Sequence, residues 1–244
     1  MSEQDTTRRA PTTMREQNPT HPTPGTMSEQ RTTHRMPGTM SEQHAARPMR
    51  DATHEQRAAL PAPESVDELM FLLATCANAW DMPDRSGDPV DILDHDRQCA
   101  ELLRRDHPED EELQVAGLVH DIGHLLVPGD DAGHGRTGAD AVRGLLGEHV
   151  ARLVELHVVA KRYLAATDSH HTATLSDSSR RTLVTQGGPM TPAEATAFEA
   201  DPDFTAALTL RRADDAGKIV GLAVAPLEFW RPVIERVAAA QQQT

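Results

Sequence analysis

Near its middle the chain reads Leu113-Gln114-Val115-Ala116-Gly117-Leu118-Val119-His120-Asp121-Ile122-Gly123-His124-Leu125-Leu126, an apolar run interrupted by two imidazoles and a carboxylate. His120 and His124 are four positions apart, so we expect both on one face of a single helix, with Asp121 about 100° round from His120. Burying a carboxylate without a cation is costly, and imidazole with carboxylate suits borderline divalent metals. The stretch therefore predicts a buried metal site, with a hydrogen-bonded core histidine beside a chance aspartate as the alternative.

Apolar residues are unevenly distributed along the 244 residues, because Leu60 is the first Val, Ile, Leu or Phe. A Met-x-Glu-Gln pattern begins at Met1, Met14, Met27 and Met40, so the first part of the chain repeats every thirteen residues. A segment with so little apolar surface cannot offset its own conformational entropy. We predict a disordered N-terminal tail of repeats over residues 1–60 and one folded domain over residues 61–244.

The folded part is strongly acidic. Residues 1–60 carry a net charge of +1, which leaves −15 for the remainder of the chain. Such a domain lacks the electrostatic footprint of a nucleic-acid-binding protein, and an anionic small-molecule substrate would need a local cluster of cations. The sequence shows neither a signal peptide nor an apolar run near the length of a membrane span. No motif in it implies a partner protein. Cys76 and Cys99 have neither zinc-finger nor redox spacing, so we expect a reduced, cytoplasmic protein.

Helical patterns cover the folded part, and neither strand alternation nor a hairpin signal occurs. Ser65 is an expected N-cap, and Thr191 with Glu194 forms an expected capping box. The sequence therefore predicts an all-α bundle. Its expected helices begin at 65, 91, 113, 138, 148, 176, 191, 203 and 227, and those of 91–106, 113–126, 138–146, 148–166, 203–220 and 227–240 have both ends defined by the pattern.

Further candidate ligands lie in or beside these helices. His95 belongs to the apolar stripe of its helix, where a satisfied core histidine is the alternative. His134 lies in an expected loop, with His149 as a more distant competitor. His157 and Lys161 are one turn apart, and a cation next to a metal-bound histidine indicates an anionic ligand between them.

Together the candidate ligands are enough for two metal ions if one carboxylate bridges them, and Asp121 is the natural bridge. An imidazole-rich set suits iron, manganese or zinc better than magnesium or calcium. The six residues are His95, His120, Asp121, His134, His157 and Asp214.

The residues resemble those of the HD-domain oxygenases of phosphonate degradation. The motif at 120–124 is the signature of the HD-domain superfamily, and the stretches Ala160-Lys-Arg-Tyr-Leu and Gln186-Gly-Gly-Pro are more specific. The similarity covers roughly residues 65–232, essentially the whole folded part. Those proteins resemble myo-inositol oxygenase in using a mixed-valence Fe(II)/Fe(III) pair and O2.

The resemblance implies a role for each residue. His95, His120 and Asp214 would hold one iron, His134 and His157 the other, with Asp121 bridging. The phosphonate would be received by Lys161, Ser179 and Arg211, and His124 would contact substrate or oxygen. The implied reaction cleaves the carbon–phosphorus bond of a 1-hydroxyalkylphosphonate to phosphate and a carboxylic acid. A solvated helix lysine at 161 and a helix-face ion pair at 211 are the alternatives.

The chain departs from the family in one place. Family members generally have Tyr-x-Gly-Glu about ten residues before the first ligand histidine, where the Tyr can gate the iron and the Glu meets an ammonium group of the substrate. This chain has Arg85-Ser86-Gly87-Asp88. We expect Arg85 and Asp88 at the substrate, whose far end would then be neutral or anionic rather than aminoalkyl.

Two other functions fit part of the pattern. A metal-dependent phosphohydrolase acting on a nucleotide or another phosphate ester needs His95, His120, Asp121 and Asp214 alone. A degenerate HD domain that serves as a binding module needs no ligand set at all. Dependence of phosphate release on oxygen separates these alternatives from the oxygenase.

Overall fold

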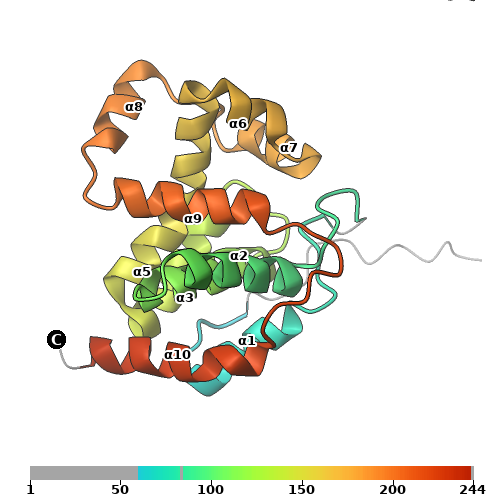
Figure 1. Ribbon diagram of the computed structural model, residues 1–244, viewed down its shortest axis with the longest axis vertical. Coiled ribbons are helices and arrows are strands. Elements are labelled where there is room, and N and C mark those ends of the chain that lie inside the picture. The colour runs from blue at the N-terminus through green and yellow to red at the C-terminus, as the bar shows by residue number, and fades with distance from the viewer. Residues whose placement is uncertain (1–59, 83–84, 243–244) are drawn as a thin grey trace, which may run out of the picture. The chain divides into compact units, whose positions relative to one another are not determined.

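The computed structural model describes residues 60–82 and 85–242. The tail predicted over residues 1–60 lies, Leu60 apart, outside these ranges. Within them the chain forms ten helices and no strand, which confirms the predicted all-α fold (Figure 1). None of the helices in the described ranges combines the length and apolar character needed to cross a bilayer.

The order of the helices follows the predicted order, with one addition, α6. In chain order they are α1 (Val66–Thr75), α2 (Ile92–Asp106), α3 (Glu111–Val119), α4 (Ile122–Leu126), α5 (His134–Thr167), α6 (Ser169–Thr174), α7 (Asp177–Thr185), α8 (Pro192–Glu199), α9 (Phe204–Ala216) and α10 (Leu227–Gln241).

Two predicted helix starts are confirmed in detail. The Glu68 amide donates to the Ser65 side chain at the start of α1, because a helix leaves its first amides without partners inside the helix. Thr191 and Glu194 form the reciprocal capping box at the start of α8.

The prediction of one continuous helix over 113–126 is wrong. α3 ends at Val119, His120 and Asp121 form a turn, and α4 begins at Ile122. The break lets α4 pack closely on α5, because a Cβ atom on Gly123 would lie 1.9 Å from the carbonyl oxygen of His134. His120 and His124 therefore do not share one helical face.

The expected break between the helices of 138–146 and 148–166 is confirmed, because α5 consists of two helices that meet at the non-helical Gly147, whose φ of +86° is accessible to glycine at little cost. Two other boundaries differ from the prediction. His134 is the first residue of α5 rather than part of a loop. Helix α9 ends at Ala216 rather than near Val220, because the chain leaves the helix at Gly217.

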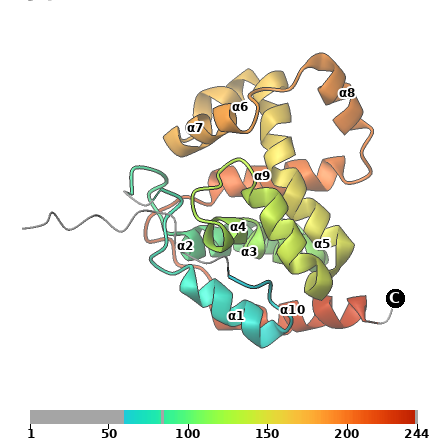
Figure 2. The ribbon, with the colours of Figure 1, turned by 180° about the vertical axis from the view of Figure 1, so that it is seen from behind.

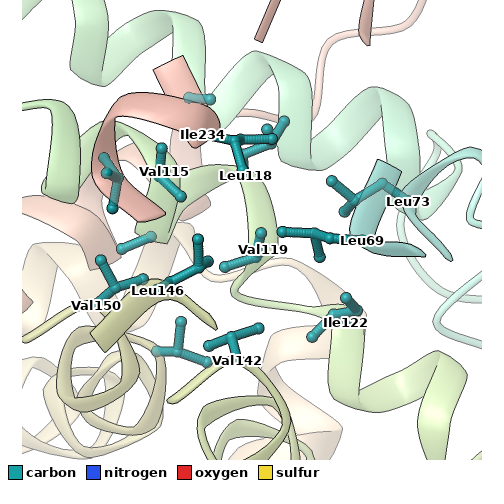
Figure 3. Close-up of a cluster of buried hydrophobic side chains, with 14 of the residues drawn as sticks. Leu69, Leu73, Val115, Leu118, Val119, Ile122, Val142, Leu146, Val150 and Ile234 are labelled. Atoms are coloured by element: carbon teal, nitrogen blue, oxygen red, sulfur yellow. The ribbon is translucent and has the colours of Figure 1, made fainter. Parts of the chain in front are cut away.

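The centre of the bundle is α3, in which every residue from Leu113 to Val119 is buried. It packs against α2, α5, α9 and α10, and Figure 2 shows α3 and α4 beside α5 from the opposite side. Figure 3 shows the resulting core, in which Leu118, Val119 and Ile122 meet side chains from the neighbouring helices. Because removal of one large apolar side chain from water contributes roughly 1.5–3 kcal/mol, this core fixes the position of the turn at 120–121.

Candidate metal centre and its pocket

The six predicted ligands come together from four places in the fold. The elements that carry them pack against one another: α2, the turn after α3, α5 (at positions 134 and 157) and α9. The residues His95, His120, His134, His157 and Asp214 are each at most 5% exposed. The candidate centre is therefore built on the rigid core of the bundle.

Two histidines face each other on one side of Asp121. The Nε2 atoms of His95 and His120 lie 3.2 Å apart. Asp121 Oδ2 lies 3.6 Å from His95 Nε2 and 3.7 Å from His120 Nε2. Asp214 Oδ1 approaches the same pair, at 3.4 Å from His95 Nε2 and 3.9 Å from His120 Nε2.

A second pair lies on the other side of the same carboxylate. The Nε2 atoms of His134 and His157 are 3.0 Å apart. Asp121 Oδ1 lies 3.5 Å from His134 Nε2 and 3.8 Å from His157 Nε2. The two oxygens of Asp121 thus face different histidine pairs, which is the arrangement that a bridging carboxylate requires.

The outer nitrogens show which tautomers are present. Each Nδ1 lies against a backbone carbonyl, which can only accept a hydrogen bond, so Nδ1 carries the proton and Nε2 offers a lone pair. The acceptors are Gly217 for His95, Gly117 for His120, Asp131 for His134 and Val154 for His157. Two lone pairs about 3 Å apart need a cation between them. The donor set of each pair, two imidazoles with carboxylate oxygens, therefore fits a transition-metal ion.

The electrostatics of the core favour metal-binding protonation states for His120, His157 and Asp121, but not for His95. Burial lowers the pKa of His120 and lowers the pKa of His157 well below its ordinary value. Burial would raise the pKa of Asp121, but His120, His134 and His124 outweigh it and hold that pKa well below its usual range. For His95, burial is outweighed by the hydrogen bond to Asp214, so its pKa is raised.

His124 stands next to the second pair without joining it. Its ring stacks on that of His134 with centroids 4.0 Å apart, and its Nε2 lies 3.9 Å from Asp121 Oδ1. Burial and the neighbouring His134 lower the pKa of His124 to about 3, so the ring is neutral at ordinary pH. It also lines the cavity that opens beside the centre.

This cavity, of about 40 Å³, is lined by both lysines of the chain and by Arg211. Lys161 is buried rather than solvated, and its Nζ donates to Thr182 Oγ1 at 2.9 Å. Burial, then the charge of Arg211, lower the pKa of Lys161 to about 7. Ser179 lies between the other two cations, 3.3 Å from Arg211 Nη2 and 3.4 Å from Lys218 Nζ.

Arg211 also makes the ion pairs that the sequence left open as an alternative. Its Nη1 donates to Asp214 Oδ2 at 2.5 Å, and it pairs with Asp215 through Nε and Nη2. Burial would raise the pKa of Asp214, but Arg211 and Lys218 hold it well below its usual range. Arg211 thus touches a candidate metal ligand and lines the pocket at the same time.

Arg85 and Asp88, in the segment that departs from the family pattern, have different surroundings. Asp88 lines the cavity, where Lys218 Nζ donates to its Oδ2 at 2.6 Å. Arg85 is not among the residues that line this cavity, and its guanidinium lies over the Trp80 ring, 4.9 Å from the centroid. The competitor His149 contacts Glu112 and Asp203 instead of the centre.

Sequence reasoning missed two charged residues of the site. Lys218 follows Asp214 by four positions and is one of only two lysines, a signal that could have placed it in the pocket. Asp96 is fully buried beside His120, and it belongs to a group with His95, His120 and Asp121 whose potential ligand atoms lie within 4.8 Å of one another. Nothing in the sequence marks Asp96, because it directly follows His95 and looks like a polar-face residue.

Known protein families and individual proteins are similar to this chain in sequence. A family model described as an HD domain matches residues 92–201, and one described as myo-inositol oxygenase matches residues 35–140. A hydroxymethylphosphonate dioxygenase from Gimesia maris is 36% identical over 155 residues, covering 60% of this chain and 77% of the relative. A glycine-betaine-forming 1-hydroxy-2-(trimethylamino)ethylphosphonate dioxygenase from Leisingera caerulea is 31% identical over 159 residues, covering 62% and 81%. An uncharacterised protein of Acanthamoeba polyphaga mimivirus is 31% identical over 158 residues, covering 61% and 72%.

Proposed function

The chain belongs to the HD-domain family that includes these phosphonate dioxygenases, and on that premise we propose that it is a diiron oxygenase that cleaves the carbon–phosphorus bond of a 1-hydroxyalkylphosphonate. One observation carries the proposal: two facing histidine pairs share the Asp121 carboxylate beside a pocket lined by three cations. A hydrolase that needs one pair alone gives no reason for the second.

The proposed centre holds two irons. His95, His120 and Asp214 would bind one, His134 and His157 the other, and Asp121 would bridge them. Bound iron would supply the redox chemistry with O2 and polarise the oxygens of the substrate. The protein would contribute position, because the outer nitrogens of all four imidazoles are held by backbone carbonyls.

The proposed reaction balances with O2 as the oxidant. A 1-hydroxyalkylphosphonate dianion and O2 give a carboxylate, hydrogen phosphate and a proton. The hydroxyl-bearing carbon loses its bonds to hydrogen and phosphorus and gains a second oxygen, and phosphorus gains an oxygen. O2 accepts the four electrons that the carbon loses, so no further reductant is consumed.

Different pocket residues would bind the phosphonate and the hydroxyl group of the substrate. Lys161, Lys218 and Arg211 would attract the phosphonate dianion, with hydrogen bonds from these cations and from Ser179 fixing its orientation. Neutral His124 cannot act as a cationic acid, so it would accept a hydrogen bond from the substrate hydroxyl. Catalysis would then rest on orientation of the C1 hydrogen more than on a protein acid or base.

The pocket also bears on the substituent of the substrate. An ammonium group would need an unpaired negative charge, but the charge of Asp88 is already balanced by Lys218, whose Nζ lies 2.6 Å from Asp88 Oδ2. A cavity of about 40 Å³ has room for a few water-sized groups beside the centre. We therefore propose a substrate with a short, uncharged substituent, as in hydroxymethylphosphonate, rather than an aminated one such as that named for the Leisingera caerulea relative.

The test is a panel of phosphonates on the iron-loaded protein. Hydroxymethylphosphonate, 1-hydroxyethylphosphonate and 2-amino-1-hydroxyethylphosphonate are supplied, with O2 uptake and phosphate release followed together. The proposal expects one O2 consumed per phosphate and a preference for the uncharged substrates. Equal phosphate release under argon would refute the oxygenase, and a preference for the aminated compound would refute the assignment of the substituent.

A further inference from the structure

One buried carboxylate lies outside the six candidate ligands. Asp96 of α2 is 0% exposed, and among the described residues neither of its oxygens has a hydrogen-bond partner. Buried polar groups are nearly always paired, and a buried carboxyl without a partner is costly. A chain that keeps such a group charged in its core needs a cation or a donor that compensates it.

The nearest donor belongs to the candidate centre. Asp96 Oδ1 lies 3.4 Å from His120 Nδ1, whose proton already points at the Gly117 carbonyl, 2.9 Å away. The Nε2 atom of His120 is on the opposite side of the same ring and faces His95, Asp121 and Asp214. The imidazole therefore stands between Asp96 and the place for a metal ion, which excludes Asp96 as a direct ligand of that ion.

A metal at Nε2 would change the character of this contact. Metal binding withdraws charge from the imidazole ring, so its Nδ1–H becomes a stronger donor and the whole ring more positive. A carboxylate on the Nδ1 side then gains an attractive partner where it has only a weak one without metal. The cost of burying Asp96 is thus offset in the metal-loaded protein.

We propose that Asp96 is a positioning residue that acts through His120, fixing the orientation of its ring and balancing the charge that the ring gains from the metal. The inference depends on the proposed metal centre but not on the proposed reaction. Its test is therefore metal binding, which can fail separately from catalysis.

The test compares Asp96→Asn with the unchanged full-length chain. The amide has the shape of the carboxylate but no charge. Fe(II) affinity is measured anaerobically by competition with a chelator, and the melting temperature is measured with and without Fe(II). We expect an affinity 10–100-fold lower, as for other partners of metal-bound histidines, and a smaller rise of melting temperature on metal addition. The metal-free melting temperature should be unchanged or higher.

A merely structural role predicts a different result. In that case Asp96→Asn lowers the melting temperature of both forms and leaves the Fe(II) affinity unchanged, which would overturn the proposal. Cys99→Ala is the matched control, because Cys99 is equally buried on the same helix; it should destabilise both forms alike. If Asp96→Asn yields little folded protein, Asp96→Ser gives the same comparison. An unchanged chain that binds no Fe(II) would instead refute the metal centre itself.

Discussion

Replacing Lys218 by Met should change which phosphonates the protein accepts. Lys218 Nζ lies 2.6 Å from Asp88 Oδ2 and 3.7 Å from Asp214 Oδ1, and the side chains of Lys218 and Asp88 are only 13% and 14% exposed. Burial is the largest single effect on the pKa of Lys218 and lowers it. The charges of Asp214 and Asp88 together outweigh burial, so the pKa of Lys218 is raised above its usual value. Lys218→Met removes this cation and leaves Asp88 without its partner at the wall of the pocket.

The magnitudes follow from the geometry. Truncation of one partner of a buried pair costs about 3–5 kcal/mol, so the variant should melt at a clearly lower temperature. The freed Asp88 carboxylate could then hydrogen-bond an ammonium group, and a charged hydrogen bond contributes about 1.5–3 kcal/mol, equivalent to roughly 10–100-fold. We expect kcat/KM for hydroxymethylphosphonate to fall. The value of kcat/KM for 2-amino-1-hydroxyethylphosphonate, divided by that for hydroxymethylphosphonate, should rise by that factor.

The assay is phosphate release with each substrate, and the double variant Asp88→Asn/Lys218→Met is the control. It removes both charges, so it should recover much of the lost stability and none of the gain toward the aminated substrate. An unchanged substrate ratio in Lys218→Met would refute the reasoning. A gain that persists in the double variant would show that Asp88 is not its source.

Three further perturbations test other parts of the site. The pKa of Lys161 is lowered to about 7, so the free protein loses this positive charge as the pH rises through 7. The kcat/KM of the unchanged protein should therefore decrease above pH 7, and the kcat/KM of Lys161→Met should not show this decrease. Gly123→Ala forces a Cβ against the His134 carbonyl and should reduce iron content and melting temperature, whereas Gly144→Ala, with no atom within 4 Å of its Cβ, should stabilise by up to about 1 kcal/mol. Removal of iron by a chelator should lower the melting temperature by roughly 5–10 °C, reversed by Fe(II), since a ligand at 100 times its Kd contributes about 2.7 kcal/mol.

Periodicity and cap residues were sufficient to predict most of the fold. Ser65, Thr191 and Glu194 act through local hydrogen bonds, so their signals are visible in a few adjacent residues. The break after Val119 is different, because it depends on the close approach of Gly123 to a backbone carbonyl of α5. Such a contact between distant segments leaves no periodic pattern.

The candidate site likewise contains residues that the sequence marks and residues that only the fold brings together. Ligand types such as His120 and Asp121 stand out because they interrupt an apolar run. By contrast, the Lys218–Asp88 pair joins residues 130 positions apart, and its distance could come only from the fold. Asp96 is hidden for a related reason: its burial results from the packing of α2 on α3, while its neighbours in sequence are polar.

The most direct test of the proposed oxygenase is turnover of hydroxymethylphosphonate by the iron-loaded protein under ¹⁸O2. Insertion of oxygen at the carbon predicts that the formate produced carries one ¹⁸O atom, the other oxygen coming from the substrate hydroxyl, and that no phosphate forms under argon. Formate and phosphate that both lack the label, with phosphate released equally under argon, would contradict the account.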